Sequence, residues 1–319
     1  MSYNSIINVI KKNKRFLITT HVNPDADAIG SALAMAVVLK SLGKSVVVFN
    51  EDVVPGWLGF LPRTAWFKRP VDIKTVDYDV AIALDCGDAS RIGNVRGLLR
   101  KGKVMVNIDH HKTNDSFGNV NLILPKASST AEILYELFSK MKIRWSKELA
   151  MLVYAGIMTD TGSFRYDCTS ARTHHIVGDL LDHGVSPQEV YTKIYDVVTV
   201  SDLRIFMQIA NNVEFILGGK IACLELSKKD LAKFSNGFDV RDKVFAWLRS
   251  AEGVEVIVIF NEVGKSRTRV NFRSKGNFDV AKLASRFQGG GHAKASGCTL
   301  ELSLQESRKK ILQEITRDL

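Results

Sequence analysis

Cysteine is scarce in this sequence, and no two cysteines are spaced as a metal-binding or redox pair. Four are present in 319 residues, and they lie far apart. They are Cys86, Cys168, Cys223 and Cys298. This pattern argues against a disulfide framework and against a zinc knuckle, and it predicts a protein of the reducing cytoplasm.

Long apolar runs, internal repeats and low-complexity tracts are also missing. Residues 1–15 are polar and basic, and the apolar run that follows is too short for a signal sequence or a membrane-spanning helix. Because hydrophobic residues make up 45% of the chain, we expect a globular protein without a membrane partner. The length allows two domains, each with its own core.

Acidic residues are outnumbered by basic ones. The chain has 44 Lys and Arg against 34 Asp and Glu, which gives a formal net charge of +10. Such an excess favours polyanionic partners, with nucleic acids and nucleotides foremost. The same excess is also found where lysine merely keeps a protein in solution, so charge alone leaves both interpretations open.

Apolar segments typical of strands alternate with helical segments over residues 1–195. One predicted strand begins at Phe16, and three others cover 45–49, 78–84 and 103–108. The predicted helices are 32–42, 130–140, 147–158, 171–183 and 186–195. Residues 50–70, rich in proline and glycine, predict a loop. The alternation predicts an α/β domain with a doubly wound parallel sheet.

Beyond this domain we predict a helical connector at 196–213 and a smaller α/β domain at 214–319. The predicted strands of the smaller domain are 220–226, 254–261 and 267–273. Its predicted helices are 239–250, 279–287 and 304–319.

Side chains that commonly bind metals follow four apolar segments, which we interpret as strand ends. They are His21, Asp25 and Asp27; Asp85; Asp109, His110 and His111; and Asp160. Each alone has an ordinary explanation, such as a helix cap or a solvated turn. Because parallel strands bring their carboxyl ends to one edge of a sheet, we expect these groups to converge. Oxygen-rich sites with one or two imidazoles suit Mn or Mg.

A glycine-rich segment near the C-terminus suggests an anion site. Gly289, Gly290 and Gly291 lack side chains, so their backbone N–H groups could approach a phosphate closely. His292 adds a donor, and Arg273 offers a planar guanidinium suited to phosphate. The alternative is a tight turn with Arg273 as a surface charge.

These motifs together resemble those of the DHH phosphoesterase superfamily. The relevant residues are His-x-x-Pro-Asp-x-Asp at 21–27, Asp85, Asp-His-His at 109–111 and Thr-Asp-Thr-Gly at 159–162. Asn-Phe-Arg-Ser at 271–274 and Gly-Gly-Gly-His at 289–292 resemble the DHH-associated C-terminal domain. The order and length are most similar to the NrnA type, which combines oligoribonuclease (nanoRNase) and pAp phosphatase activity.

The resemblance implies two divalent cations, Mn above all, with Mg or Co as alternatives. It places one cation on His21, Asp25 and Asp85, and the other on Asp27, Asp85, His110 and Asp160. It places His111 at the scissile phosphate, with Asp109 orienting the histidines. It implies that substrate is bound by Arg273, Ser274, Gly289, Gly290, Gly291 and His292. Independently of the resemblance, we consider Arg91 a second candidate for neutralising charge on the phosphoryl oxygens, the alternative being an ordinary surface residue of a helix.

The expected reaction converts short RNA or DNA oligonucleotides to nucleoside 5′-monophosphates and pAp to AMP and phosphate. Hydrolysis of cyclic dinucleotides or pApA is an alternative, and a homodimer is left open. A manganese-dependent inorganic pyrophosphatase is a second alternative, because that family carries a Ser-Arg-Lys-Lys stretch like the one at 307–310. Here the stretch lies in a predicted helix, however. A non-catalytic nucleotide-binding module is a third alternative. The complete set of expected metal ligands argues against it.

Overall fold

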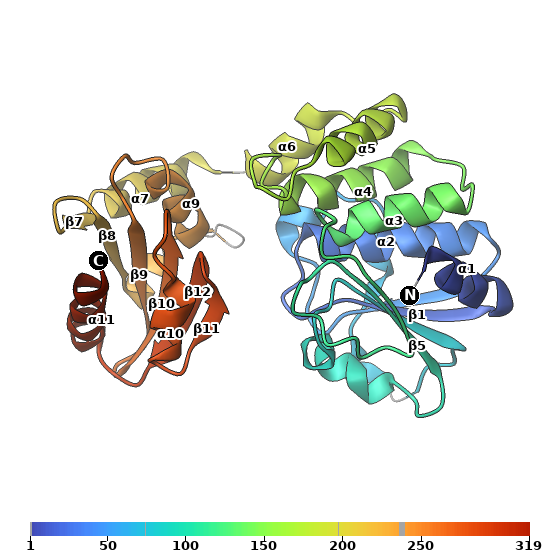
Figure 1. The fold of residues 1–319 in the computed structure, drawn as a ribbon, viewed down its shortest axis with the longest axis horizontal. Coiled ribbons are helices and arrows are strands. Elements are labelled where there is room, and N and C mark those ends of the chain that lie inside the picture. Colours follow the sequence, from blue (N-terminus) through green and yellow to red (C-terminus); the bar gives the residue numbers. More distant parts are fainter. Residues whose placement is uncertain (1, 74, 197, 236–239) are drawn as a thin grey trace. The chain divides into compact units, whose positions relative to one another are not determined.

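Two six-stranded sheets, one in each half of the chain, organise the computed structural model (Figure 1). The structure describes residues 2–73, 75–196, 198–235 and 240–319. The chain divides into a first unit, residues 1–197, and a second unit, residues 198–319. None of the described helices combines the length and the hydrophobicity needed to span a bilayer.

The first unit is an α/β domain. Its helices and strands are α1 (Tyr3–Lys12), β1 (Arg15–Thr19), α2 (Ala26–Ser41), β2 (Ser45–Phe49), β3 (Phe67–Lys68), β4 (Val80–Leu84), β5 (Val104–Asp109), β6 (Val120–Ile123), α3 (Thr130–Lys140), α4 (Lys147–Asp160), α5 (Ala171–Asp182) and α6 (Pro187–Tyr195). Its short 3-10 helices are η1 (Gly56–Leu58), η2 (Thr64–Trp66), η3 (Pro70–Asp72) and η4 (Ala89–Leu98).

All neighbouring strands of this sheet are parallel, in the order β3-β2-β1-β4-β5-β6. The chain winds from β1 outward to β3 and then, in the opposite direction, from β4 outward to β6. The strand order therefore reverses between the neighbours β1 and β4, where open parallel sheets bind their ligands. The predicted doubly wound parallel sheet is confirmed.

Both faces of the sheet are covered, which explains the continuous apolar runs of its strands. Ile18 and Ile82 belong to the core shared with α2, α3 and α4, and Figure 1 shows these three helices on one side of the sheet. Leu17 and Ala81 face the other way and pack against Ile92 of η4.

Three expectations need correction. Helix α2 begins at Ala26 rather than at residue 32, because Asp25 caps it by accepting a hydrogen bond from the Ala28 amide at 3.0 Å. Helix α4 runs to Asp160, so this carboxylate ends a helix and not a strand. The expected loop at 50–70 contains β3 at the edge of the sheet, and β6 was not predicted. Both strands are too short for a clear apolar pattern.

The second unit is a smaller α/β domain, as predicted. It contains α7 (Val200–Ala210), β7 (Glu214–Ile216), β8 (Ile221–Leu226), α8 (Lys228–Leu231), α9 (Val240–Leu248), β9 (Val256–Gly264), β10 (Arg267–Ser274), α10 (Val280–Ser285), β11 (Gly290–His292), β12 (Ala295–Leu300) and α11 (Leu304–Asp318). Strands β7, β11 and β12 and helix α8 were not predicted, and Asp239 of one predicted helix lies outside the described residues.

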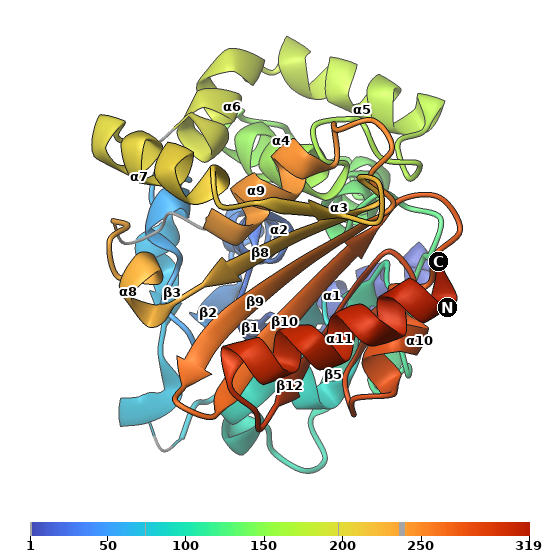
Figure 2. The same ribbon diagram turned by 90° about the vertical axis from the view of Figure 1, so that its left-hand side faces the viewer.

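The strand order of the second sheet is β11-β12-β10-β9-β8-β7, with β8 and β9 parallel and the other pairs antiparallel. Helices α10 and α11 contribute Leu283 and Ile311 to the core on one face. On the other face, α7 and α9 contribute Ile209 and Val244. Figure 2 shows α11 in front of the strands.

Gly30 lies where α2 crosses α4, and a Cβ there would meet the Leu152 carbonyl oxygen at 2.5 Å. We expect Gly30→Ala to push the helices apart and to lower the free energy of unfolding by about 1–3 kcal/mol. Thermal unfolding would measure this loss. The control is Gly178→Ala in α5, where a Cβ would meet nothing within 4 Å. This control should be neutral or stabilising by up to about 1 kcal/mol, and equal losses in both variants would contradict the expectation.

Candidate metal centre

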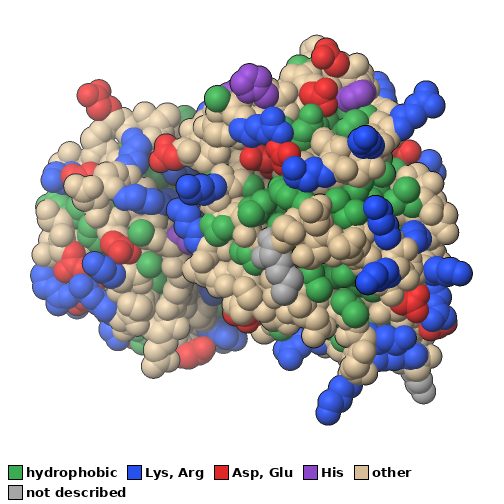
Figure 3. Space-filling model, turned by 45° about the vertical axis from the view of Figure 1, so that its right-hand side comes forward, with side chains coloured by type: hydrophobic (Ala, Val, Ile, Leu, Met, Phe, Trp, Pro, Cys, Tyr) green, Lys and Arg blue, Asp and Glu red, His purple; other side chains and the backbone are tan. Residues whose placement is uncertain are grey.

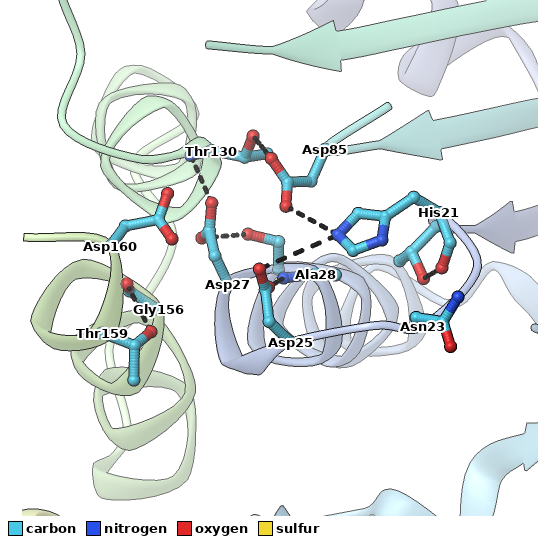
Figure 4. A network of polar contacts seen from close by, with 12 residues as sticks. His21, Asn23, Asp25, Asp27, Ala28, Asp85, Thr130, Gly156, Thr159 and Asp160 are labelled. Atoms are coloured by element: carbon cyan, nitrogen blue, oxygen red, sulfur yellow. Dashed lines mark hydrogen bonds and ion pairs between the residues drawn. The ribbon is translucent and has the colours of Figure 1, made fainter. Parts of the chain in front are cut away.

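Imidazole and carboxylate groups converge at the carboxyl edge of the first sheet. His21 follows β1, Asp85 follows β4 and His110 follows β5, whereas Asp27 comes from the first turn of α2 and Asp160 from the end of α4. Figure 4 shows four of these side chains, together with Asp25, pointing toward one another. The site is thus assembled from three strand ends and two helices.

The groups form two clusters that meet at Asp85. One cluster is His21, Asp25 and Asp85, and another is Asp27, His110 and Asp160; the ligand atoms within each lie within 4.8 Å of one another. Asp85 Oδ2 lies 3.4 Å from His21 Nε2, and Asp85 Oδ1 lies 3.5 Å from His110 Nε2. Asp85 therefore presents one oxygen to each cluster.

The spacing of these atoms suits cations. Neighbouring ligand atoms of an octahedral cation with bonds near 2.1 Å are about 3 Å apart, and His110 Nε2 lies 3.1 Å from Asp160 Oδ2. The mixture of carboxylate oxygen and imidazole nitrogen matches the donors that Mn²⁺ and similar ions accept. All six residues predicted as metal ligands lie in these two clusters.

The backbone and neighbouring side chains of Asp85 hold it in place. Asp85 has a φ of +59°. Residues other than glycine rarely adopt this left-handed backbone conformation, and those that do are often found at functional sites. Its amide donates to the Ile108 carbonyl at 3.0 Å, and the Thr130 hydroxyl donates to its Oδ1 at 3.1 Å. With 2% of its surface exposed, the carboxylate has little room to move.

The loop after β1 fixes the His21 ring. His21 Nδ1 lies 2.8 Å from the Val22 carbonyl oxygen, so the proton belongs on Nδ1 and Nε2 faces Asp85. This tautomer is the one in which Nε2 can ligate a metal. The Asn50 side chain donates to the His21 carbonyl at 2.9 Å, and the Val22 amide donates to the Arg91 carbonyl at 2.7 Å.

The Asp27 side chain, which comes from α2, contacts the amino end of α3. It accepts hydrogen bonds from the amides of Thr130 at 2.7 Å and Ala131 at 2.8 Å. The start of a helix favours a negative charge. Gly156 of α4 allows this arrangement, because a Cβ there would lie 2.6 Å from Asp27 Oδ1. Sequence reasoning missed Thr130 and Gly156; a glycine inside an apolar helix was the available signal.

The electrostatics show a surplus of buried negative charge. Burial, together with the charges of Asp85 and Asp160, raises the pKa of Asp27 well above its usual range. Burial also raises the pKa of Asp160 to about 6, against the effect of its hydrogen bond with His110. Burial would lower the pKa of His110, but its bond to Asp160 and the charges of Asp27 and Asp85 raise it to about 10. Bound protons or metal cations would therefore stabilise this group of carboxylates.

Asp109 and His111 form a further group with Asp85 and His110, whose ligand atoms also lie within 4.8 Å of one another. His111 Nδ1 is 2.7 Å from Asp109 Oδ1, and the Asn114 side chain donates to Asp109 Oδ2 at 2.6 Å. Asp109 is fully buried, whereas His111 is partly exposed. The hydrogen bond to Asp109 raises the pKa of His111. Arg91, predicted near the phosphate, is the third residue of η4, and its carbonyl accepts the hydrogen bond from the Val22 amide in the His21 loop.

The residues predicted to bind substrate in the second unit have different surroundings. Arg273 on β10 places its guanidinium 4.7 Å from the centre of the Phe245 ring. Ser274 points into the unit: it is 4% exposed, and its hydroxyl donates to the Phe278 carbonyl at 2.7 Å. Arg273 and Ser274 therefore lie on opposite faces of β10. The Ser274 hydroxyl faces the interior of the unit, which does not fit the expected contact with substrate.

The glycines at 289–291 adjoin and enter the edge strand β11. A Cβ on Gly291 would meet the Ala295 carbonyl oxygen at 2.5 Å, and one on Gly289 would collide with the Gly297 carbonyl oxygen. Two of the glycines are thus required by the close approach of β12. Gly290, by contrast, faces open space and His292 is exposed, so this part of the strand is accessible.

The chain matches two family descriptions in the order of its two units. Residues 15–157 match the DHH family, N-terminal domain, and residues 209–319 match the DHHA1 domain. The bifunctional oligoribonuclease and PAP phosphatase NrnA of Thermus thermophilus is 32% identical over 95% of this chain and 89% of that protein. The protein of the same name from Bacillus subtilis is 30% identical, with 92% of each chain covered.

The chain belongs to the DHH family. It is an NrnA-type protein and a hydrolytic enzyme. The crystal structure of an exopolyphosphatase-related protein from Bacteroides fragilis has the same fold, with a TM-score of 0.89 and 26% identity over 98% of this chain and 94% of that one. DHH phosphoesterases depend on metal ions, and the two clusters of this DHH enzyme are suited to hold them.

Thr130 offers a test of the metal centre that leaves every expected ligand in place. We expect Thr130→Val to weaken Mn²⁺ binding by about 10- to 100-fold, because Asp85 loses the hydroxyl that orients it. Thr130→Ser keeps the hydroxyl and should restore the affinity. Calorimetric titration with Mn²⁺ measures both, and circular dichroism checks the fold. Unchanged affinity in the valine variant would show that the hydroxyl does not position Asp85.

Proposed function

We propose that this enzyme uses two divalent cations to hydrolyse short oligoribonucleotides to nucleoside 5′-monophosphates and pAp to AMP and phosphate. The observation that carries the proposal is Asp85, whose two oxygens face separate clusters of ligands. The names of the Thermus and Bacillus relatives support the choice of substrates.

In this proposal His21, Asp25 and Asp85 hold one cation, and Asp27, Asp85, His110 and Asp160 hold the other. The bound pair would supply an activated water molecule near neutral pH and compensate charge on the phosphoryl oxygens. Manganese is the first choice, with Mg or Co as alternatives, since the donors are mixed carboxylate and imidazole.

His111 and Arg91 are proposed to act on the scissile phosphate. Asp109 anchors the His111 ring and raises its pKa, which favours the doubly protonated imidazolium. In that state Nε2–H can donate to a phosphoryl oxygen or to the leaving 3′-oxygen. The Arg91 guanidinium would add a second positive charge for the phosphoryl oxygens.

The second unit is proposed to recognise a terminal 5′-phosphate. Arg273 lies on the more exposed face of β10, and the amides near Gly290 and the exposed His292 could contact the same anion. A nucleotide held in this way carries its next phosphorus on the 3′-oxygen. That phosphorus is bare in pAp and continues into the chain in an oligonucleotide, so one chemistry serves both substrates.

The net positive charge of the chain supports a polyanionic substrate but does not indicate where on the surface the substrate binds. On the face drawn in Figure 3, the Lys and Arg side chains of the described residues are spread over the surface with acidic side chains among them. Attraction would therefore be general, and specificity would depend on the residues named above.

The pyrophosphatase alternative loses its main support. The Ser-Arg-Lys-Lys stretch at 307–310 lies in α11, where Ser307 is fully buried. Arg308 Nη2 forms an ion pair with Glu214 Oε2 at 2.6 Å and lies near Glu225. These contacts explain the stretch as part of the second unit's own packing.

The direct test follows products over time from 5′-labelled di- to pentanucleotides, pAp, pApA, a cyclic dinucleotide and pyrophosphate with Mn²⁺. We expect nucleoside 5′-monophosphates from the short oligonucleotides, including pApA, and AMP from pAp. Removal of the metal with a chelator should stop both reactions, and Mn²⁺ should restore them. Release of phosphate from pyrophosphate alone would contradict the proposal, and so would binding without turnover.

Asp85→Asn should reduce turnover of every substrate to below about 1% of wild type, because both cations lose a charged ligand. The matched control is Asp79→Asn, just before β4, whose carboxylate pairs with Arg15. This control should retain turnover. Rates on pAp and on a dinucleotide, together with bound metal per protein, measure the difference. An asparagine variant at position 85 with substantial turnover would remove the bridging role.

Arg273→Ala should lower kcat/KM for 5′-phosphorylated dinucleotides by about 10- to 100-fold, the size expected for a lost charge-assisted hydrogen bond. Hydrolysis of a generic bis(p-nitrophenyl) ester should change little. Arg269→Ala is the control, because Arg269 faces the same side of β10 and its Nη1 donates to Thr299 instead. Equal losses on both substrates would refute phosphate recognition by Arg273.

A further inference from the structure

A cavity of about 360 Å³ lies at the carboxyl ends of β2 and β3 in the first unit. Its lining includes Asp52, Pro55, Gly56, Phe67, Lys68 and Arg69. No residue of this lining belongs to the metal clusters or to the residues proposed above to bind substrate. Its volume falls in the range of pockets that hold small ligands, about 300–1,000 Å³.

The cavity adjoins the loop that carries His21 and Asp25. Asp52 Oδ2 accepts a hydrogen bond from the Asn23 amide at 2.6 Å, and Asn23 lies midway between these two expected ligands. Asn50 links the same elements, since its side chain donates to the His21 carbonyl and accepts from the Asp52 amide at 2.8 Å. Figure 4 shows Asn23 on the His21 side of the site, away from Asp160.

The topology places the cavity and the metal clusters on one edge of the sheet. Strands β2 and β3 are parallel to β1 and follow it on the side away from β4. Their carboxyl ends therefore continue the edge on which the clusters lie. The cavity belongs to the half of the edge that holds His21 and Asp25.

The lining suits a nucleoside attached to a phosphodiester. Pro55 and Phe67 offer an apolar wall against which a base can pack. Lys68 and Arg69 are exposed cations, and Arg69 is anchored by the hydrogen bond from its Nε to the Glu51 carbonyl at 3.2 Å. Asp52 is the acidic residue among those named, and its Oδ2 is already engaged by Asn23.

We propose that this cavity holds the nucleoside on the far side of the scissile phosphate, the one linked to it through its 5′-oxygen. The inference rests on the proposed function and adds a subsite to it. In pApA this position is the second adenosine, whereas in pAp the phosphate carries no further group. The cavity therefore contributes to oligonucleotide hydrolysis and not to pAp hydrolysis.

Lys68→Glu tests the subsite without touching a metal ligand. We expect kcat/KM for pApA and for a 5′-phosphorylated trinucleotide to fall about 10-fold, mainly through KM, while pAp hydrolysis stays within twofold of wild type. High salt should narrow the difference between wild type and variant, because the contact is electrostatic. The control is Lys101→Glu, which makes the same charge change in the turn before β5, at the opposite edge of the sheet.

A second variant, Gly56→Trp, tests the cavity by filling it. Gly56 lines the cavity, and a Cβ there would meet nothing within 4 Å, so a side chain can be attached at this position without a backbone clash at its first atom. It too should reduce pApA turnover and spare pAp. Equal effects on both substrates, no effect on either, or an equal effect of Lys101→Glu would overturn the subsite. If the wild-type enzyme hydrolyses neither pAp nor pApA, the proposed function itself fails and the subsite falls with it.

Discussion

Buried like charges are the constraint on which the first unit depends. Asp27 and Asp85 are almost completely buried, and Asp160 lies at the carboxyl end of α4, where the helix dipole disfavours a negative charge. Such a group stays ionised only beside hydrogen-bond donors and positive charge. The start of α3 provides donors to Asp27 and Asp85, and the imidazoles provide charge when protonated. Divalent cations would do the same more completely, so the packing of three helices against the sheet is tied to the chemistry at its edge.

The parts of the fold that were predictable are those whose burial is complete. Strands β1, β4 and β5 are covered on both faces by helices and loops, so they appear in the sequence as mostly apolar runs. The start of α2 was not predictable in the same way. Asp27 and Ser31 interrupt its apolar pattern, yet both are buried. Asp27 accepts hydrogen bonds from the amides at the start of α3, and the Ser31 hydroxyl donates in turn to Asp27. Local periodicity carries no information about such distant partners, and for the same reason Asp160 was assigned to a strand end.

The site divides in a similar manner between groups that bear chemistry and groups that place them. The histidines and carboxylates can be recognised in the sequence by residue type and spacing. Thr130, Gly156 and Asn50 cannot, because their roles depend on contacts between segments distant in the sequence. Strand β10 alternates between exposed and buried residues, so Arg273 and Ser274 must face opposite sides of the sheet, and Ser274 shares the buried face with Phe272. The family motif grouped two neighbours that the pleat separates.

The reversal of strand order between β1 and β4 also explains how the edge can serve more than one purpose. On the β1 side, the ligand-bearing loop is held by residues that follow β2, chiefly Asn50 and Asp52, and a cavity opens beyond them. On the β4 side, Asp27 and Asp160 come from the ends of α2 and α4, and Gly156 brings these helices together. Asp85 stands at the reversal and belongs to both sides. Because the lining of the cavity contributes none of the expected metal ligands, a nucleoside subsite at this place, as proposed above, would let substitutions change substrate preference while the charge balance around Asp85 is preserved.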